Sequence, residues 1–216
     1  DYSAMHRPYA IFVAGQGHNI AYNTVYGWHD GIDISTYAPP PADPRLRTCS
    51  VDMHHNFITG MNDDGMELEP GPCNIIVREN RFTRNFMAIS FQATYGGPNY
   101  ILRNVIDDID HLPFKHVHNS AGTVMYHNTV FTDGAIWLSS DAKNGRFMNN
   151  LFMNTSSRPA IISGLDCRPL PQTLDYNGYG PGHGAFQWGL ARELHLGFVS
   201  RDLHPDLAAF QQATGH

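Results

Sequence analysis

The chain has 216 residues, of which 42% are hydrophobic and only 16% are charged, and this length suits a single domain with one sizeable core. Twenty acidic residues outweigh fourteen basic ones, and the resulting formal net charge of -6 argues against nucleic acid or an anionic membrane as a partner. No apolar run approaches the roughly 18 residues that a membrane span requires. The 20 glycines, 14 prolines and 16 asparagines predict many turns and few long helices.

Asparagine recurs at a nearly constant spacing along the chain. The aligned positions are Asn23, Asn56, Asn80, Asn104, Asn128 and Asn150, separated by 33, 24, 24, 24 and 22 residues. Alternating apolar residues precede each asparagine, and a short turn and a second alternating run such as GIDIS, GMELE or AISFQ follow. Alternation with a period of two is typical of strands with one buried face. A repeat of about 24 residues built from such strands indicates a solenoid.

These features predict an all-β fold, a right-handed single-stranded parallel β-helix with about six recognisable coils over residues 1–165. Coils stack about 4.8 Å apart, so an asparagine at the same turn of every coil can pass hydrogen bonds along the stack, and the ladder asparagines are expected to be structural. The one long step contains a proline-rich loop insertion at 36–48. Residues 166–216 are expected to form an irregular tail with a short helix that ends at Gly215, and the chain to continue into a missing segment.

Two of the three cysteines share a repeat position. Cys49 and Cys73 each lie seven residues before a ladder asparagine, so adjacent coils should bring them within disulfide range. The spacing leaves two alternatives open, a disulfide or an inward stack of two small thiols. Cys167 lies outside the coils and has no metal-ligand spacing around it.

Over residues 8 to 165 the coils resemble the repeats of secreted carbohydrate-active β-helix proteins, a superfamily of pectate and alginate lyases, polygalacturonases and mannuronan epimerases. The resemblance implies a polysaccharide or oligosaccharide substrate and an extracellular or periplasmic location, although the given chain carries no signal peptide. It leaves the reaction and the oligomeric state open, because these repeats serve hydrolases, lyases, epimerases, tailspikes and adhesins.

In a β-helix the inward side chains form the core, so chemistry is expected on side chains that point outward from one sheet and on the turns beside it. The second alternating runs predict an outward column that consists of Asp33, Glu67, Ser90, Lys115 and Trp137. His116 and His118 are expected beside Lys115 as a proton-transfer pair. Acids and bases can move protons, and a flat aromatic ring can stack on a sugar. The expected substrate-binding residues are Asp33, Arg84, Gln92, His118 and Trp137.

Three aspartates stand in turns just before the outward runs. WHDGIDI carries Asp30, and NDDGMEL carries Asp63 and Asp64. This layout is similar to the polygalacturonase family, in which such carboxylates act as general acid and base in an inverting hydrolysis. That family continues with a Gly-His-Gly turn, whereas this chain has RNFMA, so the resemblance extends only to the carboxylates. The expected catalytic residues are Asp30, Asp63, Asp64, Glu67, Lys115 and His116.

Three functions follow from this reading. The leading one is a glycoside hydrolase with paired carboxylates and no required cofactor. The second is a polysaccharide lyase, in which Ca2+ bound by Asp33, Glu67 and Glu69 assists while Lys115 or a histidine takes the C5 proton. The third is a non-catalytic β-helix that binds glycan or forms part of a surface protein.

Overall fold

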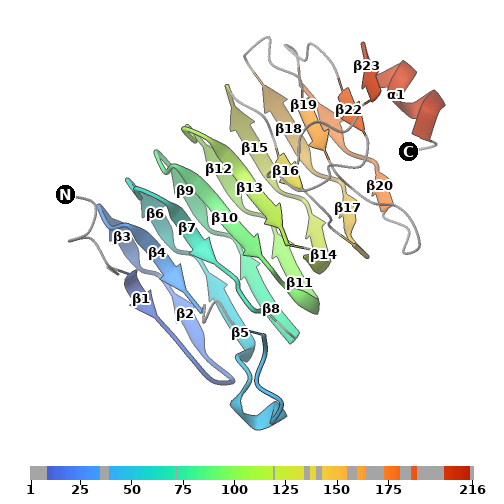
Figure 1. The fold of residues 1–216 in the computed structure, drawn as a ribbon. Helices are drawn as coiled ribbons and strands as arrows, with labels where there is room; N and C mark the ends of the chain where they lie inside the picture. Colours follow the sequence, from blue (N-terminus) through green and yellow to red (C-terminus); the bar gives the residue numbers. More distant parts are fainter. Residues whose placement is uncertain are drawn as a thin grey trace.

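The computed structural model describes residues 9–34, 39–71, 73–118, 120–133, 137–139, 143–154, 160–163, 173–180, 186–188 and 202–214. Within these ranges the chain passes through three strands per coil, and successive coils stack into a solenoid (Figure 1). The predicted all-β parallel β-helix is therefore confirmed. No helix in the described part of the chain has the length and apolar character needed to cross a bilayer.

Each strand of a coil joins one of three long sheets. Sheet A has the order β1 (Tyr9–Phe12), β4 (Asp30–Asp33), β7 (Asp64–Glu67), β10 (Met87–Gln92), β13 (Leu112–Val117), β16 (Trp137–Ser139), β19 (Ala160–Ser163), β22 (Phe186–Trp188) and β23 (Asp202–His204). Sheet B has the order β2 (Asn19–Ala21), β5 (Cys49–His54), β8 (Cys73–Arg78), β11 (Tyr95–Leu102), β14 (Ala121–Tyr126), β17 (Arg146–Met148) and β20 (Thr173–Asp175). Sheet C runs from β3 (Thr24–Tyr26) through β6 (Phe57–Thr59), β9 (Arg81–Thr83), β12 (Val105–Asp107), β15 (Thr129–Thr132) and β18 (Leu151–Asn154) to β21 (Gly178–Tyr179). Pairing is parallel throughout except between β22 and β23.

The asparagine ladder lies at the turn between sheets B and C. Asn80 shows the pattern: its backbone N and its Nδ2 both donate to Oδ1 of Asn104, at 3.0 and 3.1 Å. Nδ2 of Asn80 also donates to the Met53 carbonyl at 2.9 Å, which ties it to the coil on the other side. The same bonds recur from Asn23 to Asn150. The ladder thus satisfies buried main-chain groups at one turn of every coil.

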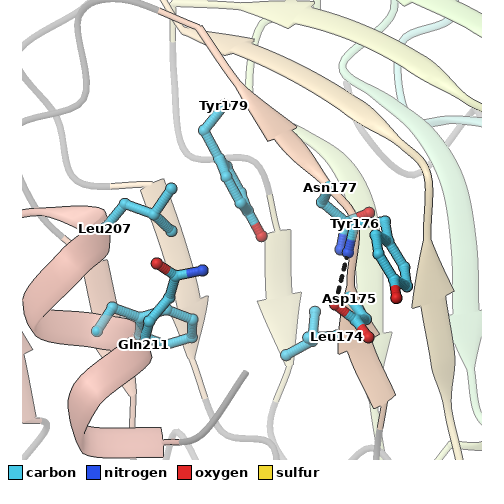
Figure 2. Close-up of a pocket in the computed structure, with 8 residues that line it drawn as sticks. Leu174, Asp175, Tyr176, Asn177, Tyr179, Leu207 and Gln211 are labelled. Carbon is cyan, nitrogen blue, oxygen red and sulfur yellow. Dashed lines mark hydrogen bonds between the residues drawn. The ribbon is translucent and has the colours of Figure 1, made fainter.

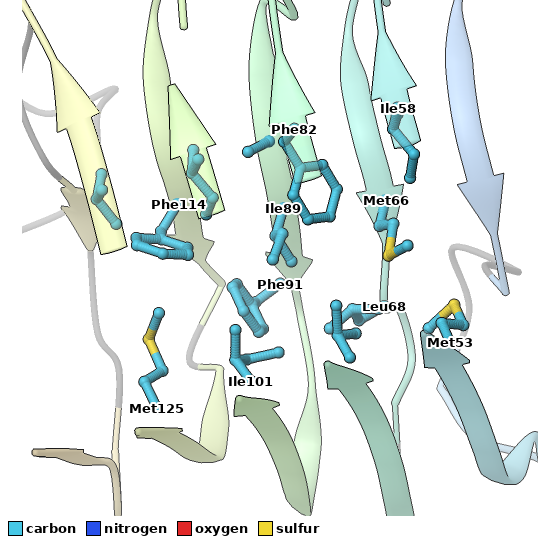
Figure 3. Close-up of a cluster of buried hydrophobic side chains, with 14 of the residues drawn as sticks. Met53, Ile58, Met66, Leu68, Phe82, Ile89, Phe91, Ile101, Phe114 and Met125 are labelled. Carbon is cyan, nitrogen blue, oxygen red and sulfur yellow. The ribbon is translucent and has the colours of Figure 1, made fainter. Parts of the chain in front are cut away.

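The interior of the solenoid is filled by columns of apolar side chains, one residue from each coil (Figure 3). Sheet A contributes Ile32, Met66, Ile89 and Phe114, all fully buried and in register. Sheet B contributes Ile20, Met53, Val77, Ile101, Met125, Phe147 and Leu174. Sheet C contributes Val25, Ile58, Phe82, Ile106, Val130 and Phe152. These columns are the inward half of the alternating runs in the sequence.

His116 belongs to this interior and not to the outward face. Its ring stacks on Phe91 with centroids 4.0 Å apart and planes at 8°, and it is 1% exposed. Burial lowers the pKa of His116 to about 3. The prediction that His116 works beside Lys115 is wrong, because neighbouring residues of a strand point to opposite faces and Lys115 takes the outward one.

The coils continue past residue 165, where the repeats were predicted to end. β20 and β21 pair with β17 and β18, and Asn177 accepts from the backbone N and Nδ2 of Asn150, both at 3.0 Å. This coil was not recognised in the sequence because the step from Asn150 to Asn177 is 27 residues long. Pro169 and Pro171 also interrupt the alternating pattern before Asn177.

The predicted C-terminal helix is present as α1 (Leu207–Thr214); Gly215 lies outside the described residues. Asp206 Oδ1 caps the helix by accepting from the Ala209 backbone N at 2.8 Å. Phe210 is 2% exposed and joins the core cluster. Figure 2 shows α1 facing Leu174 and Tyr179 across a small cavity of about 40 Å³. The helix therefore covers apolar residues of the last described coil.

Cys49 and Cys73 form a disulfide, which resolves the alternative that the sequence left open. They are register partners in β5 and β8, with a Cα–Cα distance of 5.1 Å. The bridge links adjacent coils next to the predicted loop insertion, whose described residues contain the short 3-10 helix η2 (Pro44–Leu46). Ser35 to Ala38 at the start of this connection are outside the described residues.

Replacing one asparagine in the middle of the ladder should destabilise the whole stack. In Asn104→Ala the backbone N of Asn80 and the carbonyl of Val77 lose their partners in a buried place. Leaving such groups unsatisfied costs on the order of 3 kcal/mol. Urea unfolding should show this loss, whereas Asn62→Ala, which alters an exposed asparagine, should change the unfolding free energy by less than about 0.5 kcal/mol. Equal effects of the two variants would contradict the role of the ladder.

The buried His116 should make the fold sensitive to acid. Its pKa in the folded state is about 3, below the ordinary 6.5, so the unfolded chain takes up a proton that the folded chain refuses. The contribution of neutral His116 to the free energy of unfolding is fully present above pH 6.5. It falls by about 1.4 kcal/mol per pH unit as the pH drops toward 3. Between pH 7 and 4.5 the free energy of unfolding of His116→Phe should therefore fall by about 2.5 kcal/mol less than that of the natural protein. Urea titrations at the two pH values measure this difference. Asn62→Ala, which alters an exposed residue without a titratable group, should keep the natural pH dependence.

Candidate functional site

Two neighbouring strands of sheet A each begin with an aspartate. Asp30 opens β4 and Asp64 opens β7, and the Asp64 backbone N donates to Oδ1 of Asp30 at 3.2 Å. Their side chains are 4% and 0% exposed. Asp30 and Asp64 are 34 residues apart in the sequence, so the stacking of coils brings distant carboxylates into contact distance.

The glycine after each aspartate is required by close packing between coils. A Cβ on Gly31 would lie 2.3 Å from the Gly65 carbonyl oxygen, and a Cβ on Gly65 would lie 2.6 Å from the Ala88 carbonyl oxygen. Neither distance is compatible with a side chain. The Asp-Gly pairs thus mark a tight entry into sheet A, and the carboxylates lie where adjacent coils approach closely.

A single lysine reaches this pair from two strands away. Lys115 in β13 places Nζ 2.6 Å from Oδ2 of Asp64, and the Lys115 side chain is only 13% exposed. The intervening strand β10 offers the small Ser90 at the register position of Lys115. A charge-assisted bond of this length between buried groups fixes the position of the lysine amine.

Further acids complete a group that we call the acidic cluster: Asp30, Asp63, Asp64 and Glu67. One carboxylate oxygen each from Asp30, Asp64 and Glu67 lie within 4.8 Å of one another. A second set with the same spacing consists of His29, Asp30 and Asp63, so Asp30 belongs to both. Asp63 and His29 form the accessible side, with side chains 37% and 26% exposed.

Burial dominates the electrostatics of the cluster. It raises the pKa of Asp64 to about 6, although the Lys115 ammonium opposes this shift. It also raises the pKa of Asp30, against the backbone hydrogen bond from Asp64. Burial alone would lower the pKa of Lys115, but the nearby carboxylates, Asp64 first, outweigh it and raise the pKa. Lys115 is therefore held as an ammonium, and Oδ1 of Asp64 is buried without a hydrogen-bond partner among the described residues.

Glu69 belongs to neither ligand-distance group, although its charge interacts with Asp64 and Lys115. Its Oε1 accepts from Ser90 Oγ at 2.5 Å and from the Gln92 backbone N at 2.6 Å. Burial raises the pKa of Glu69 to about 7. The predicted calcium set of Asp33, Glu67 and Glu69 is not the set that converges, because only Glu67 shares a ligand-distance group, with Asp30 and Asp64.

Four residues of the predicted outward column pair in register, but most of them are buried and do not form an exposed surface. Asp33, Glu67, Ser90 and Lys115 are consecutive register partners, yet the first three are at most 2% exposed. Leu138, and not Trp137, continues the column, because Trp137 pairs with Phe114. The predicted place of Trp137 in this column is therefore wrong by one register position, and its part in substrate binding stays a prediction.

The remaining predicted substrate contacts are dispersed. Arg84 is exposed in the turn after β9, and His118 is exposed just after β13. Gln92 is half-buried at the end of β10, where its backbone N donates a hydrogen bond to Glu69 Oε1. His29 was not among the predicted site residues, and its place directly before Asp30 in WHDG is the sequence signal that could have indicated it.

The acidic cluster has the chemistry of a cation site. Its inner set of Asp30, Asp64 and Glu67 offers only carboxylate oxygens, which suit hard cations such as calcium. The unpartnered buried Oδ1 of Asp64 supplies an independent reason for a ligand there, since buried polar atoms in native proteins nearly always have partners.

Comparison with curated proteins and with solved structures finds no match to the chain. A family model described as "Right handed beta helix region" matches residues 5–152, which is more than half of the chain. This range contains the ladder from Asn23 to Asn150 and the whole acidic cluster with Lys115. The parallel coils, the ladder and this match together show that the chain belongs to the right-handed β-helix family.

Proposed function

We propose that the protein is a carbohydrate-active enzyme that cleaves an acidic polysaccharide by cation-assisted β-elimination. The observation that supports this is the convergence of Asp30, Asp64 and Glu67 within 4.8 Å, with the Lys115 amine 2.6 Å from Asp64. A carboxylate set that suits a hard cation thus stands next to a candidate base, and elimination from a uronate needs both.

The acidic cluster would hold the cation through Asp30, Asp64 and Glu67, with Asp63 on the accessible side. When bound, a calcium ion would neutralise the uronate carboxylate and acidify its C5 proton. The cation would compete with Lys115 for the Asp64 carboxylate and disfavour the ammonium, so the Lys115 proton would pass to water and the neutral amine would accept the C5 proton. The electron pair of the C5–H bond forms a double bond to C4, the C4–O bond breaks, and the leaving oxygen takes a proton from water.

Glycoside hydrolysis is the second candidate, and the raised pKa of Asp64, about 6, supports it because a general acid must stay protonated near neutral pH. The spacing is less favourable. Oxygens of Asp30 and Asp64 approach within 4.8 Å, whereas an inverting pair stands about 6.5–9.5 Å apart to admit a water. A close cluster with a lysine therefore favours elimination over inversion.

Calcium should stabilise the fold if the acidic cluster binds it. At a calcium concentration 100 times the Kd, the midpoint of thermal unfolding should rise by roughly 5–10 °C, and EDTA should reverse the rise. Asp30→Asn and Asp64→Asn should each abolish most of the shift. Asp43→Asn is the matched control, because Asp43 lies in the inserted loop beside Arg45, and it should keep the full shift. A natural protein that shows no shift with calcium would exclude the cation site.

Lys115 should be required for cleavage. Lys115→Arg keeps the positive charge next to Asp64 but is too basic to accept a proton, so the rate should fall by roughly 10²–10⁴-fold. Lys143→Ala changes the other lysine of the chain and should leave the rate unchanged. The assay follows both new reducing ends and the ultraviolet absorbance of unsaturated uronates on a panel of plant and algal polysaccharides.

The two signals of this assay separate the candidate functions. Both signals together support elimination, while reducing ends without absorbance would show hydrolysis. Binding of a polysaccharide without either product would show a non-catalytic β-helix. Circular dichroism of each variant at the assay temperature checks that a lost rate does not reflect a lost fold.

A further inference from the structure

A second feature on the molecule suits a sugar, and it lies outside the acidic cluster. It is a depression of about 390 Å³ on the outer side of sheet C, a volume in the ordinary range for small-ligand sites. The lining residues come from the ends of β9, β12 and β15 and the positions just after them: Arg81, Thr83, Asp107, Asp108, Phe131, Thr132 and Asp133. We call it the sheet C depression.

Phe131 gives the depression an aromatic wall. The residue is 44% exposed and points outward, because its neighbour Val130 is fully buried in the core. Phe131 is the register partner of Asp107, which in turn pairs with Thr83. Three successive coils therefore present a hydroxyl group (Thr83), a carboxylate (Asp107) and an aromatic ring (Phe131) at the same outward position. An exposed ring beside polar groups provides an apolar face and hydrogen-bond acceptors in one place.

The charge of the depression restricts what can bind. Arg81 Nη2 lies 3.0 Å from Asp107 Oδ2, so this pair is neutral overall. The lining contains three aspartates against one arginine, which leaves two negative charges in excess, from Asp108 and Asp133. This excess repels a uronate. Carboxylates accept hydrogen bonds from hydroxyl groups, so a neutral hydroxyl-rich ring meets no such repulsion.

The depression is placed to act together with the acidic cluster. Both adjoin the turn that leads from sheet C to sheet A: Asp108 directly follows β12, and Asp63 lies between β6 and β7. The depression occupies the coils of β9, β12 and β15, while the cluster occupies those of β4 and β7. At about 4.8 Å per coil, the offset along the axis is on the order of 10 Å. A chain of linked sugars can span such a distance.

We propose that the sheet C depression is a subsite for a neutral sugar unit, with the ring of Phe131 as a stacking platform and Asp108 and Asp133 as acceptors for sugar hydroxyls. Because the proposed function places a uronate at the acidic cluster, the two sites together define the substrate as a heteropolysaccharide that contains both uronate and neutral sugars. The second statement rests on the proposed function, whereas the binding of a neutral sugar does not.

Isothermal titration of the full chain tests the subsite. The probes are tetrasaccharides of glucose, galactose, mannose and xylose, with tetragalacturonate as the anionic probe and a glucosamine tetramer as the cationic one. At least one neutral probe should bind, and Phe131→Ala should weaken it by about tenfold. Val105→Ala is the matched control, because Val105 is 43% exposed on the same sheet but does not line the depression. It should bind within twofold of the natural chain.

Three results would overturn the subsite: no neutral probe binds, Phe131→Ala binds as well as the natural chain, or the charged probes bind more tightly in a Phe131-dependent way. Cleavage measurements keep this separate from the proposed function. Phe131→Ala should cleave short uronate oligomers at the natural rate and long mixed polymers more slowly, whereas Lys115→Arg should bind the neutral probe normally but cleave nothing. If the neutral probe does not bind but uronate oligomers are cleaved, the subsite proposal has failed. If the neutral probe binds but nothing is cleaved, the proposed function has failed.

Discussion

The hydrogen-bonded asparagine ladder sets the alignment on which the rest of the molecule depends. The side chain of each ladder asparagine from Asn56 to Asn150 satisfies main-chain groups of the preceding coil, so a coil that slipped by one residue would leave buried donors without partners. This penalty keeps all three sheets in register. Asp30 and Asp64 are 34 residues apart, and Asp64 and Lys115 are 51 apart. Only a fixed stacking of coils brings them together.

The same regularity divides the residues of each strand between two roles: inward side chains form the core, and outward side chains can form a site. In β13, Phe114 points into the core and Lys115 points out to Asp64, while His116 points in again and stacks on Phe91. Inward positions along the stack form continuous apolar columns, and these columns carry the favourable burial energy. Outward positions can then hold groups that lower stability, such as buried carboxylates, without breaking the columns.

Patterns that repeat from coil to coil were readable from the sequence, and features that depend on a single coil were not. The 24-residue spacing predicted the ladder and the adjacency of Cys49 and Cys73, and the common place of Asp30 and Asp64 before the outward runs predicted that they lie in successive coils. It did not place Trp137, because the alternating run AIWLS was aligned one residue away from the register that pairs Leu138 with Lys115. Burial of the outward carboxylates was also unpredictable, since alternation identifies a face but not whether that face meets solvent.

The chemistry of the acidic cluster is not explained by folding needs. In the described part of the chain the Asp30 side chain accepts a hydrogen bond from the Asp64 backbone N, and a neutral asparagine would accept the same bond. Burial raises the pKa values of Asp30 and Asp64, which means that their charged forms are disfavoured where they lie. The coil of β10 shows that this turn folds without acids, because Asn85 and Phe86 precede β10 and Met87 is the register partner of Asp64. Acids that reduce stability and are replaceable as hydrogen-bond acceptors are best explained by a ligand that needs their charge.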